Sequence, residues 1–245
     1  MTTIRSAMVL AAGLGTRMRP LTEHIAKPLL PLGGRALLDH ALDRLAAAGV
    51  ARVVVNAHWH AALVAAHLGE RKPPPEIVLR HEEALLETGG SVAACLDLLG
   101  PGPFFVVNGD TFWLDGPSPA LARMEAAWSD ESDEIDALLL LHRSFQTQNE
   151  VGFGDFAMDP LGRIRRPKER EIVPYIYSGV QLLHPRLFAA APPGQFSMNL
   201  LWDRAIAAGR LRAIVHDGLW FHLSTPPDLA HAESQLHEGV TGETR

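Results

Sequence analysis

Two glycines, an arginine and a lysine lie close together near the start of the chain. Gly13 and Gly15 follow a short apolar run, Arg17 comes directly after them, and Lys27 precedes a proline. Glycines adopt positive φ angles at no steric cost, so successive backbone N–H groups can converge on an anion. An arginine can add a bidentate contact to phosphate oxygens. The pattern predicts a loop that binds a polyphosphate, completed by Ala11, Ala12 and Thr16. On the Gly-x-Gly fragment alone, an ordinary strand-to-helix turn of an α/β protein stays open as the alternative.

A carboxylate follows another hydrophobic run further along the chain. Asn108, Gly109 and Asp110 come directly after the apolar residues 104–107. A carboxylate at the carboxyl end of a strand suits a hard cation such as Mg²⁺, held between protein and phosphate oxygens. An Asn-Gly turn with Asp110 as a helix cap explains the same residues. On these residues alone, both interpretations stay open.

A third group of small and polar residues lies between a predicted strand and a predicted helix. Glu87 is followed by Thr88 and then by the pair Gly89 and Gly90. Paired glycines allow a planar base to pack closely against the backbone, and an ordinary helix start accounts for them equally well. Asn56, which follows its own strand, is a further candidate for the wall of a site or for a helix cap.

The elements that would position these residues alternate along the chain. Apolar runs predict strands over residues 7–10, 53–55, 77–79, 104–107, 137–141, 153–158 and 178–183. Helical periodicity and end signals predict helices over 36–48, 61–68, 89–99, 199–208 and 228–236, with a frayed tail after Leu236. Such alternation predicts an α/β fold, Rossmann-like, with a mainly parallel sheet, helices on both faces and ligands at the carboxyl ends of strands.

Composition limits the classes of function. The 245 residues are 47% hydrophobic, which is enough to bury a large core in one domain. The formal net charge of −6 gives no global basic field, so we expect no nucleic-acid partner. The single cysteine, Cys95, excludes an intramolecular disulfide and a cysteine cluster for zinc. No apolar run reaches the length of a signal or membrane-spanning segment, so we expect a cytoplasmic protein with no membrane partner.

The phosphate-loop sequence as a whole resembles a known family. Its glycines stand in register with a set of residues typical of sugar-1-phosphate nucleotidylyltransferases: Arg17, Pro20, Thr22, Lys27, Pro28 and Pro31. Among these nucleotide-sugar pyrophosphorylases, the short chain and its Glu-Thr-Gly-Gly sequence are most similar to N-acetylmuramate 1-phosphate uridylyltransferases. The resemblance implies one domain over 1–245, with a nucleotide-binding half (1–115) and a sugar-binding half (116–238).

The resemblance also implies roles for individual residues. It implies catalytic roles for Arg17, Lys27 and Asp110, and it implies that Asp110 is a ligand of Mg²⁺ or Mn²⁺. Nucleotide contacts are implied for Ala11, Ala12, Gly13, Gly15, Thr16, Arg17, Glu87, Gly89, Gly90 and Asn108. Sugar contacts are implied for Gly152, Asp155, Lys168, Ser178 and Gly179. Each sugar candidate has a plain alternative as a bulge, a turn carboxylate or a solvated charge.

One segment departs from the family pattern. Where relatives carry an aspartate as the second metal ligand, two residues after a tryptophan, this chain has Trp220 followed by His222. Imidazole suits Mn²⁺ better than Mg²⁺, which prefers oxygen. We therefore treat His222 as a candidate second metal ligand, with a structural hydrogen-bonding residue as the alternative.

The resulting hypothesis is nucleotidyl transfer. The expected partners are a nucleoside triphosphate, with UTP favoured, and a sugar 1-phosphate such as N-acetylmuramate 1-phosphate; the expected assembly is a monomer or a small homo-oligomer. Guanylyl or cytidylyl transfer to another sugar or alcohol phosphate stays open, as does a non-catalytic nucleotide-sugar-binding domain. A dinucleotide-dependent oxidoreductase is disfavoured because Met18 stands where the dinucleotide fingerprint has its third glycine.

Overall fold

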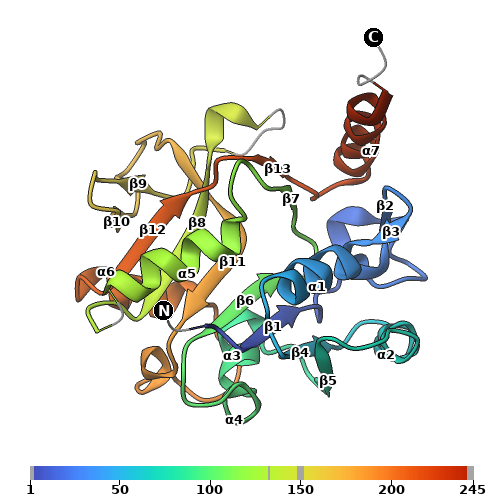
Figure 1. The fold of residues 1–245 in the computed structure, drawn as a ribbon, viewed down its shortest axis with the longest axis horizontal. Coiled ribbons are helices and arrows are strands. Elements are labelled where there is room, and N and C mark those ends of the chain that lie inside the picture. The colour runs from blue at the N-terminus through green and yellow to red at the C-terminus, as the bar shows by residue number, and fades with distance from the viewer. Residues whose placement is uncertain (1–2, 132, 148–151, 242–245) are drawn as a thin grey trace.

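A seven-stranded sheet forms the centre of the computed structural model, which describes residues 3–131, 133–147 and 152–241. The strand order is β12-β8-β11-β6-β1-β4-β5 (Figure 1). These strands are β1 (Ser6–Leu10), β4 (Arg52–Ala57), β5 (Glu76–His81), β6 (Phe104–Asn108), β8 (Ala137–Arg143), β11 (Tyr175–Leu183) and β12 (Leu211–Val215). Neighbours are parallel except around β11, which is antiparallel to both β6 and β8. The predicted mainly parallel sheet is confirmed.

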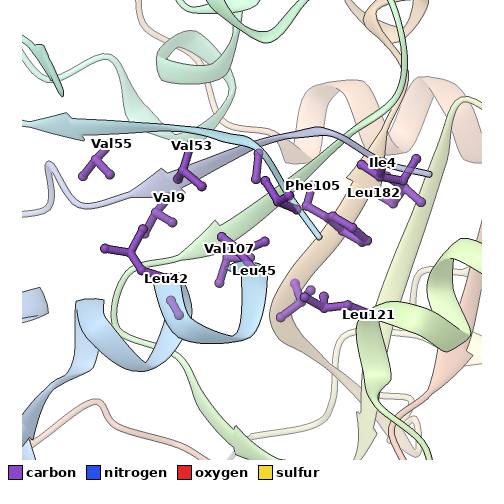
Figure 2. Packing of buried hydrophobic residues seen from close by; sticks show 14 of the residues in the cluster. Ile4, Val9, Leu42, Leu45, Val53, Val55, Phe105, Val107, Leu121 and Leu182 are labelled. Carbon is purple, nitrogen blue, oxygen red and sulfur yellow. The ribbon is translucent and has the colours of Figure 1, made fainter. Parts of the chain in front are cut away.

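Helices cover both faces of the sheet. One face carries α1 (Leu37–Ala47), α2 (Ala61–Gly69) and α5 (Ala120–Glu131), and the other α3 (Glu87–Ala93), α4 (Leu96–Leu99) and α6 (Asn199–Ala207). Strand side chains alternate between the two cores: Val9, Val53 and Phe105 pack with Leu42 and Leu121 (Figure 2), while their neighbours Met8, Val54 and Phe104 enter the second core. Because successive strand residues point to opposite faces, uninterrupted apolar runs are buried on both sides.

A third cluster joins the two ends of the chain. It combines Met18, Leu32 and Leu37 from the N-terminal part with Phe221 and Leu229 from the C-terminal part. The elements involved are the hairpin of β2 (Pro31–Leu32) and β3 (Arg35–Ala36), the pair β7 (Phe112–Leu114) and β13 (Leu219–Phe221), and α7 (Pro226–Thr241), which ends at the upper right of Figure 1. Met18 belongs to the predicted phosphate loop, so the C-terminal helix packs beneath that loop.

Three predicted elements differ in the structure. The single helix over 89–99 is wrong: α3 and α4 are separate, because Cys95 leaves the helical region at φ −118°. The strand over 153–158 is reduced to β9 (Ala157–Met158), which pairs with β10 (Ile164–Arg165), because Gly154 at φ +84° lies against the Val173 carbonyl. The tail after Leu236 is helical as far as Thr241.

The second half of the chain contains elements that the patterns did not reveal. Helix α5 and strand β12 were not predicted. Asp136 is an anchor: its carboxylate accepts hydrogen bonds from Arg210 at 2.8 Å and from Arg186. Both predicted halves contribute strands to one sheet. Within the described ranges, no helix has the length and apolar character needed to cross a bilayer.

Candidate active site

A cleft of about 540 Å³ opens at the carboxyl ends of β1, β4 and β6. Most predicted nucleotide-site residues line it: Ala11, Ala12, Gly13, Gly15, Thr16, Arg17, Lys27, Glu87, Asn108 and Asp110. Its described lining does not include the remaining predicted site residues: Gly89, Gly90, Gly152, Asp155, Lys168, Ser178, Gly179 and His222. The structure thus brings the predicted phosphate loop and the predicted metal carboxylate together in one cleft.

The phosphate loop is fixed at both ends and open in the middle. At its start, the Ala11 N–H donates to Oδ1 of buried Asn56 at 2.8 Å. At its end, buried Thr22 donates through Oγ1 to the Gly15 carbonyl at 2.8 Å. Gly15 has φ +61°, and an added Cβ would lie 3.0 Å from Thr22 and 3.1 Å from Lys27, so only glycine suits this position. Arg17, two residues after the second anchor, is exposed and available for an anion.

Lys27 and Asp110 form an ion pair at the floor of the cleft. The Lys27 Nζ lies 2.6 Å from Oδ2 of Asp110, and the lysine side chain is 10% exposed against 38% for the aspartate. Gly109 lets the strand end approach closely: its N–H donates to the Leu10 carbonyl at 2.8 Å, and an added Cβ would lie 2.8 Å from that oxygen. A buried charge is costly unless paired, so the contact with Asp110 offsets the burial of the Lys27 charge until a ligand enters the cleft.

The donor set around Asp110 fits a magnesium ion that is shared with a ligand. Mg²⁺ is usually held by one or two carboxylates together with substrate phosphates and water. Asp110 lines the cleft beside the cations Arg17 and Lys27, where phosphate oxygens would complete such a set. Among the residues described, no group of three or more His, Cys, Asp or Glu side chains could hold a metal by itself. A metal here therefore depends on the bound phosphates.

His222 does not line the cleft. It lies on the segment after β13, its ring 5.5 Å from that of Trp220, and it lines a neighbouring cavity with Asp228. Burial lowers the pKa of His222, Arg17 and Lys27 lower it further, and Asp228 and Asp110 act in the opposite direction. This placement favours the structural alternative over direct metal ligation.

Removing the His222 imidazole tests the two alternatives. If phosphate and carboxylate oxygens alone hold the ion, we expect His222→Ala to leave the Mg²⁺ and Mn²⁺ concentrations for half-maximal activity within about twofold of wild type. The measurement is titration of both metals against both proteins. A curve displaced to higher concentration, more for Mn²⁺ than for Mg²⁺, would identify His222 as a ligand.

The glycine pair at 89 and 90 has a packing role that the sequence did not reveal. Both N–H groups donate to the Phe196 carbonyl, at 2.9 and 3.0 Å. A Cβ on Gly89 would lie 2.4 Å from the Phe196 ring, and one on Gly90 2.3 Å from the Gly194 carbonyl. The space expected for a base is therefore taken by residues 194–196, and the cleft is lined instead by Glu87, Thr88 and Ser91.

This packing gives a prediction about stability. Gly89→Ala forces a methyl group into the Phe196 ring, so we expect a loss of about 1–3 kcal/mol in the free energy of unfolding, the usual cost of overpacking. Thermal and urea unfolding measure it. Gly102→Ala is the matched control, since nothing lies within 4 Å of its added Cβ. A normal melting temperature with a raised KM for the nucleotide would instead support base packing at Gly89.

The predicted sugar residues lie outside the cleft lining, and several have structural partners. The buried Ser178 hydroxyl donates to the Leu140 carbonyl, and Gly179, at φ +88°, would bring a Cβ 3.0 Å from Thr111. Asp155 accepts the Tyr177 N–H through Oδ2 at 2.8 Å. Lys168 is exposed, and so is Gly152, next to residues outside the described ranges. Sugar contacts from these five residues stay a prediction.

The sequence interpretation missed Glu82. This residue follows β5, is 5% exposed and lines the cleft. Its Oε1 accepts Nδ2 of Asn56 at 2.8 Å, while Oε2 is buried without a hydrogen-bond partner in the described structure. The sequence signal that could have found it was its position: Asn56, Glu82 and Asn108 lie at or next to the carboxyl ends of β4, β5 and β6, and all three line the cleft. Gln195 and Ser224, from distant parts of the chain, also line it.

Comparison with known proteins identifies the class. The sequence model of the family described as Nucleotidyl transferase matches residues 6–236, so the chain belongs to this family of nucleotidyltransferases. It is 42% identical to the N-acetylmuramate alpha-1-phosphate uridylyltransferase of Caulobacter vibrioides, over 95% of this chain and 97% of that protein. The corresponding protein of Neisseria meningitidis is 32% identical, over 93% and 96%. The predicted family is confirmed.

Two further similar proteins are a relative named for a different nucleotide base and a solved structure that is compared for its fold. A mannose-1-phosphate guanylyltransferase of Mycobacterium tuberculosis is 39% identical, over 96% of this chain and 65% of that protein. A solved UDP-glucose pyrophosphorylase complexed with UDP-glucose matches with a TM-score of 0.79 at 16% identity, over 96% of this chain and 99% of that one. At this identity the match supports the fold alone.

Proposed function

We propose that the protein transfers a uridylyl group from UTP to N-acetylmuramate 1-phosphate, giving a nucleotide-sugar and pyrophosphate. The observation that carries the proposal is that Arg17, Lys27 and Asp110 line the same cleft. The 42% identity to a uridylyltransferase, over nearly the whole chain, supports it. Such a product is a precursor of cell-wall peptidoglycan, so a role in recycling cell-wall sugar in the cytoplasm is part of the proposal.

The chemistry needs positioned charges rather than a nucleophilic side chain. An oxygen of the sugar phosphate attacks the α-phosphorus in line, the bond between that phosphorus and the bridging oxygen breaks, and pyrophosphate leaves with the electron pair. The attacking phosphate is already ionised near neutral pH, so no general base is required. Arg17 would stabilise the charge growing on the leaving pyrophosphate, and the loop amides at 13–16 would orient the triphosphate.

Lys27 would change partners during binding. In the structure it is paired with Asp110, and an α-phosphate entering the cleft would offer it a second anion. Asp110 would then be free to hold Mg²⁺ or Mn²⁺ with the phosphate oxygens, where the metal supplies Lewis-acid stabilisation of negative charge. In the absence of substrate, Lys27 and Asp110 therefore balance each other's charge, and both already lie in the cleft where the phosphate and the metal would bind.

Glu82 is our candidate for reading the base. An unpaired, buried carboxylate oxygen is costly and would be satisfied by an N–H donor. Uracil offers one such donor on its pairing edge, at N3, whereas cytosine has a lone pair at N3 and its donor at the neighbouring N4 amino group. Asn56 occupies the other carboxylate oxygen, so Glu82 offers a single free acceptor, which matches uracil.

Truncation of this residue gives a prediction about nucleotide choice. We expect Glu82→Ala to raise KM for UTP by about tenfold, the value of one hydrogen bond to a charged group, and to reduce the preference for UTP over CTP. Steady-state kinetics with both nucleotides measure it. Glu83→Ala is the control, because exposed Glu83 does not line the cleft. Unchanged selectivity in Glu82→Ala would exclude the residue as the base reader.

A pyrophosphate-release screen tests the proposed function. Each of UTP, GTP, CTP and dTTP is combined with N-acetylmuramate 1-phosphate, mannose 1-phosphate and glucose 1-phosphate in the presence of Mg²⁺. The proposal expects the highest kcat/KM for UTP with N-acetylmuramate 1-phosphate. Preference for GTP with mannose 1-phosphate would replace it with the activity named for the Mycobacterium relative, and nucleotide-sugar binding without turnover would indicate a non-catalytic protein.

A further inference from the structure

A second cavity of about 330 Å³ lies beside the nucleotide cleft. It is enclosed by β13, the end of β8 and one side of α7, and we name it the Trp220 cavity after the residue at its centre. It shares no described lining residue with the nucleotide cleft. Its volume lies at the lower end of the range for small-molecule sites, which suits a ligand of monosaccharide size.

An unsatisfied imidazole lines this cavity. His142 is 2% exposed, and its Nδ1 is buried without a hydrogen-bond partner within the described ranges. Its ring lies 5.7 Å from the ring of Trp220 and 6.2 Å from that of His216. Burial lowers the pKa of His142 to about 4, with His216 and Arg143 acting in the same direction, so the ring is neutral at physiological pH. A neutral imidazole has one donor and one acceptor nitrogen.

The lining differs from that of the nucleotide cleft in charge. No lysine or arginine is found among the described residues that line the Trp220 cavity, whereas Arg17 and Lys27 line the cleft. Without a cation, the cavity offers nothing to offset the cost of desolvating a phosphate. The carboxylate of Asp228, which also lines the cavity, would repel a phosphate further. The indole of Trp220, the imidazole of His142 and the side chains of Gln146 and Thr147 offer a flat apolar surface together with uncharged polar groups.

We propose that the Trp220 cavity binds a second small molecule: an uncharged, phosphate-free sugar whose hydroxyl or amide groups hydrogen-bond with His142 and whose ring lies against Trp220. This site is separate from the cleft lined by Arg17, Lys27 and Asp110. A group that both donates and accepts, as a hydroxyl does, would satisfy the buried imidazole.

Trp220 also connects this cavity to the reaction centre. Its Nε1 donates to the Ser178 carbonyl at 2.8 Å and to Thr111 Oγ1 at 3.2 Å, and Thr111 follows Asp110 in the chain. If the proposed function holds, a sugar against Trp220 should change kcat while leaving the apparent affinity for UTP nearly unchanged. Binding of the sugar itself does not depend on the protein being a uridylyltransferase.

Saturation-transfer NMR on the full chain tests the proposal. The probes are methyl α-glucoside, methyl N-acetylglucosaminide and, as the negative probe, glucose 6-phosphate. The two neutral glycosides should bind at millimolar concentration, and saturating UDP or N-acetylmuramate 1-phosphate should not displace them. His142→Phe should weaken their binding by about tenfold, the value of one or two lost hydrogen bonds, with UDP affinity unchanged. His142→Gln, which retains a donor and an acceptor, should restore binding.

Three results would overturn the proposal. The first is that neither neutral glycoside binds to the wild-type protein. Displacement of a bound glycoside by N-acetylmuramate 1-phosphate would show that the cavity is part of the acceptor site. Equal binding by wild type and His142→Phe would place the sugar elsewhere. If His142→Phe does not fold, the displacement experiment on the wild-type protein still decides between a separate site and the acceptor site, and UDP binding reports on the nucleotide site independently.

Discussion

Arg17→Ala should lower kcat/KM by roughly a hundredfold or more, because loss of one preorganised donor to a developing oxyanion costs about 2.7 to 4 kcal/mol. Arg17 is exposed, and the loop directly before it is held by Asn56 and Thr22. The substitution should therefore remove charge without disturbing the fold. Steady-state kinetics with UTP, together with a melting curve to confirm an unchanged fold, measure the effect.

The lysine variant at the same position separates charge from geometry. Arg17→Lys keeps the charge but cannot reproduce the planar, bidentate contact of a guanidinium with phosphate, so activity should be restored only in part. Arg19→Ala is the matched control, because Arg19 is exposed nearby but does not line the cleft. Activity within about threefold of wild type for Arg17→Ala would show that this loop does not bind the triphosphate.

Asp110→Asn should lower activity by a similar factor, because it removes a proposed metal ligand. An amide is a weaker ligand for a divalent cation than a carboxylate, so kcat should fall by about a hundredfold or more and more metal should be needed for half-maximal rate. The variant also leaves buried Lys27 without its ion pair, which should lower the free energy of unfolding. Kinetics over a range of Mg²⁺ and Mn²⁺ concentrations and a separate unfolding experiment distinguish the two consequences.

The double variant Asp110→Asn with Lys27→Met shows whether the fall in kcat comes from a lost metal ligand or from a misplaced Lys27. If Asp110 acts only by orienting Lys27, Asp110→Asn should have no additional effect on kcat in a Lys27→Met background. If it holds the metal, the additional loss should persist and metal dependence should still change. A wild-type metal activation curve for Asp110→Asn would remove Asp110 from the metal site.

The first half of the chain could be predicted well because its physical signals are local. Residues 7–10 and 104–107 are uninterrupted apolar runs ending in glycine and polar residues, which indicate both the buried strands and the cleft at their ends. The long-range partners were not accessible in the same way. Nothing near Gly89 in the sequence indicates that Phe196 fills the space beside it, and nothing near Asn56 indicates that it bridges Ala11 and Glu82.

The second half resisted prediction because its structure depends on tertiary contacts. Strand β11 lies between β6 and β8 and runs antiparallel to both, an arrangement that follows from sheet order and not from its own residues. Asp155 and Ser178 have the residue types expected for sugar contacts, but their side chains bond to the Tyr177 N–H and the Leu140 carbonyl. Residue type alone could not distinguish these uses.

The third cluster has a consequence for the protein during its synthesis. Met18 of the phosphate loop belongs to a buried cluster that also contains Phe221 and Leu229, which the ribosome adds some two hundred residues later. A nascent chain can form the early βαβ units as they emerge, but the cluster that includes Met18 stays incomplete until residues 221–229 have been added. The growing polypeptide should therefore acquire its nucleotide affinity only after those residues have emerged from the ribosome.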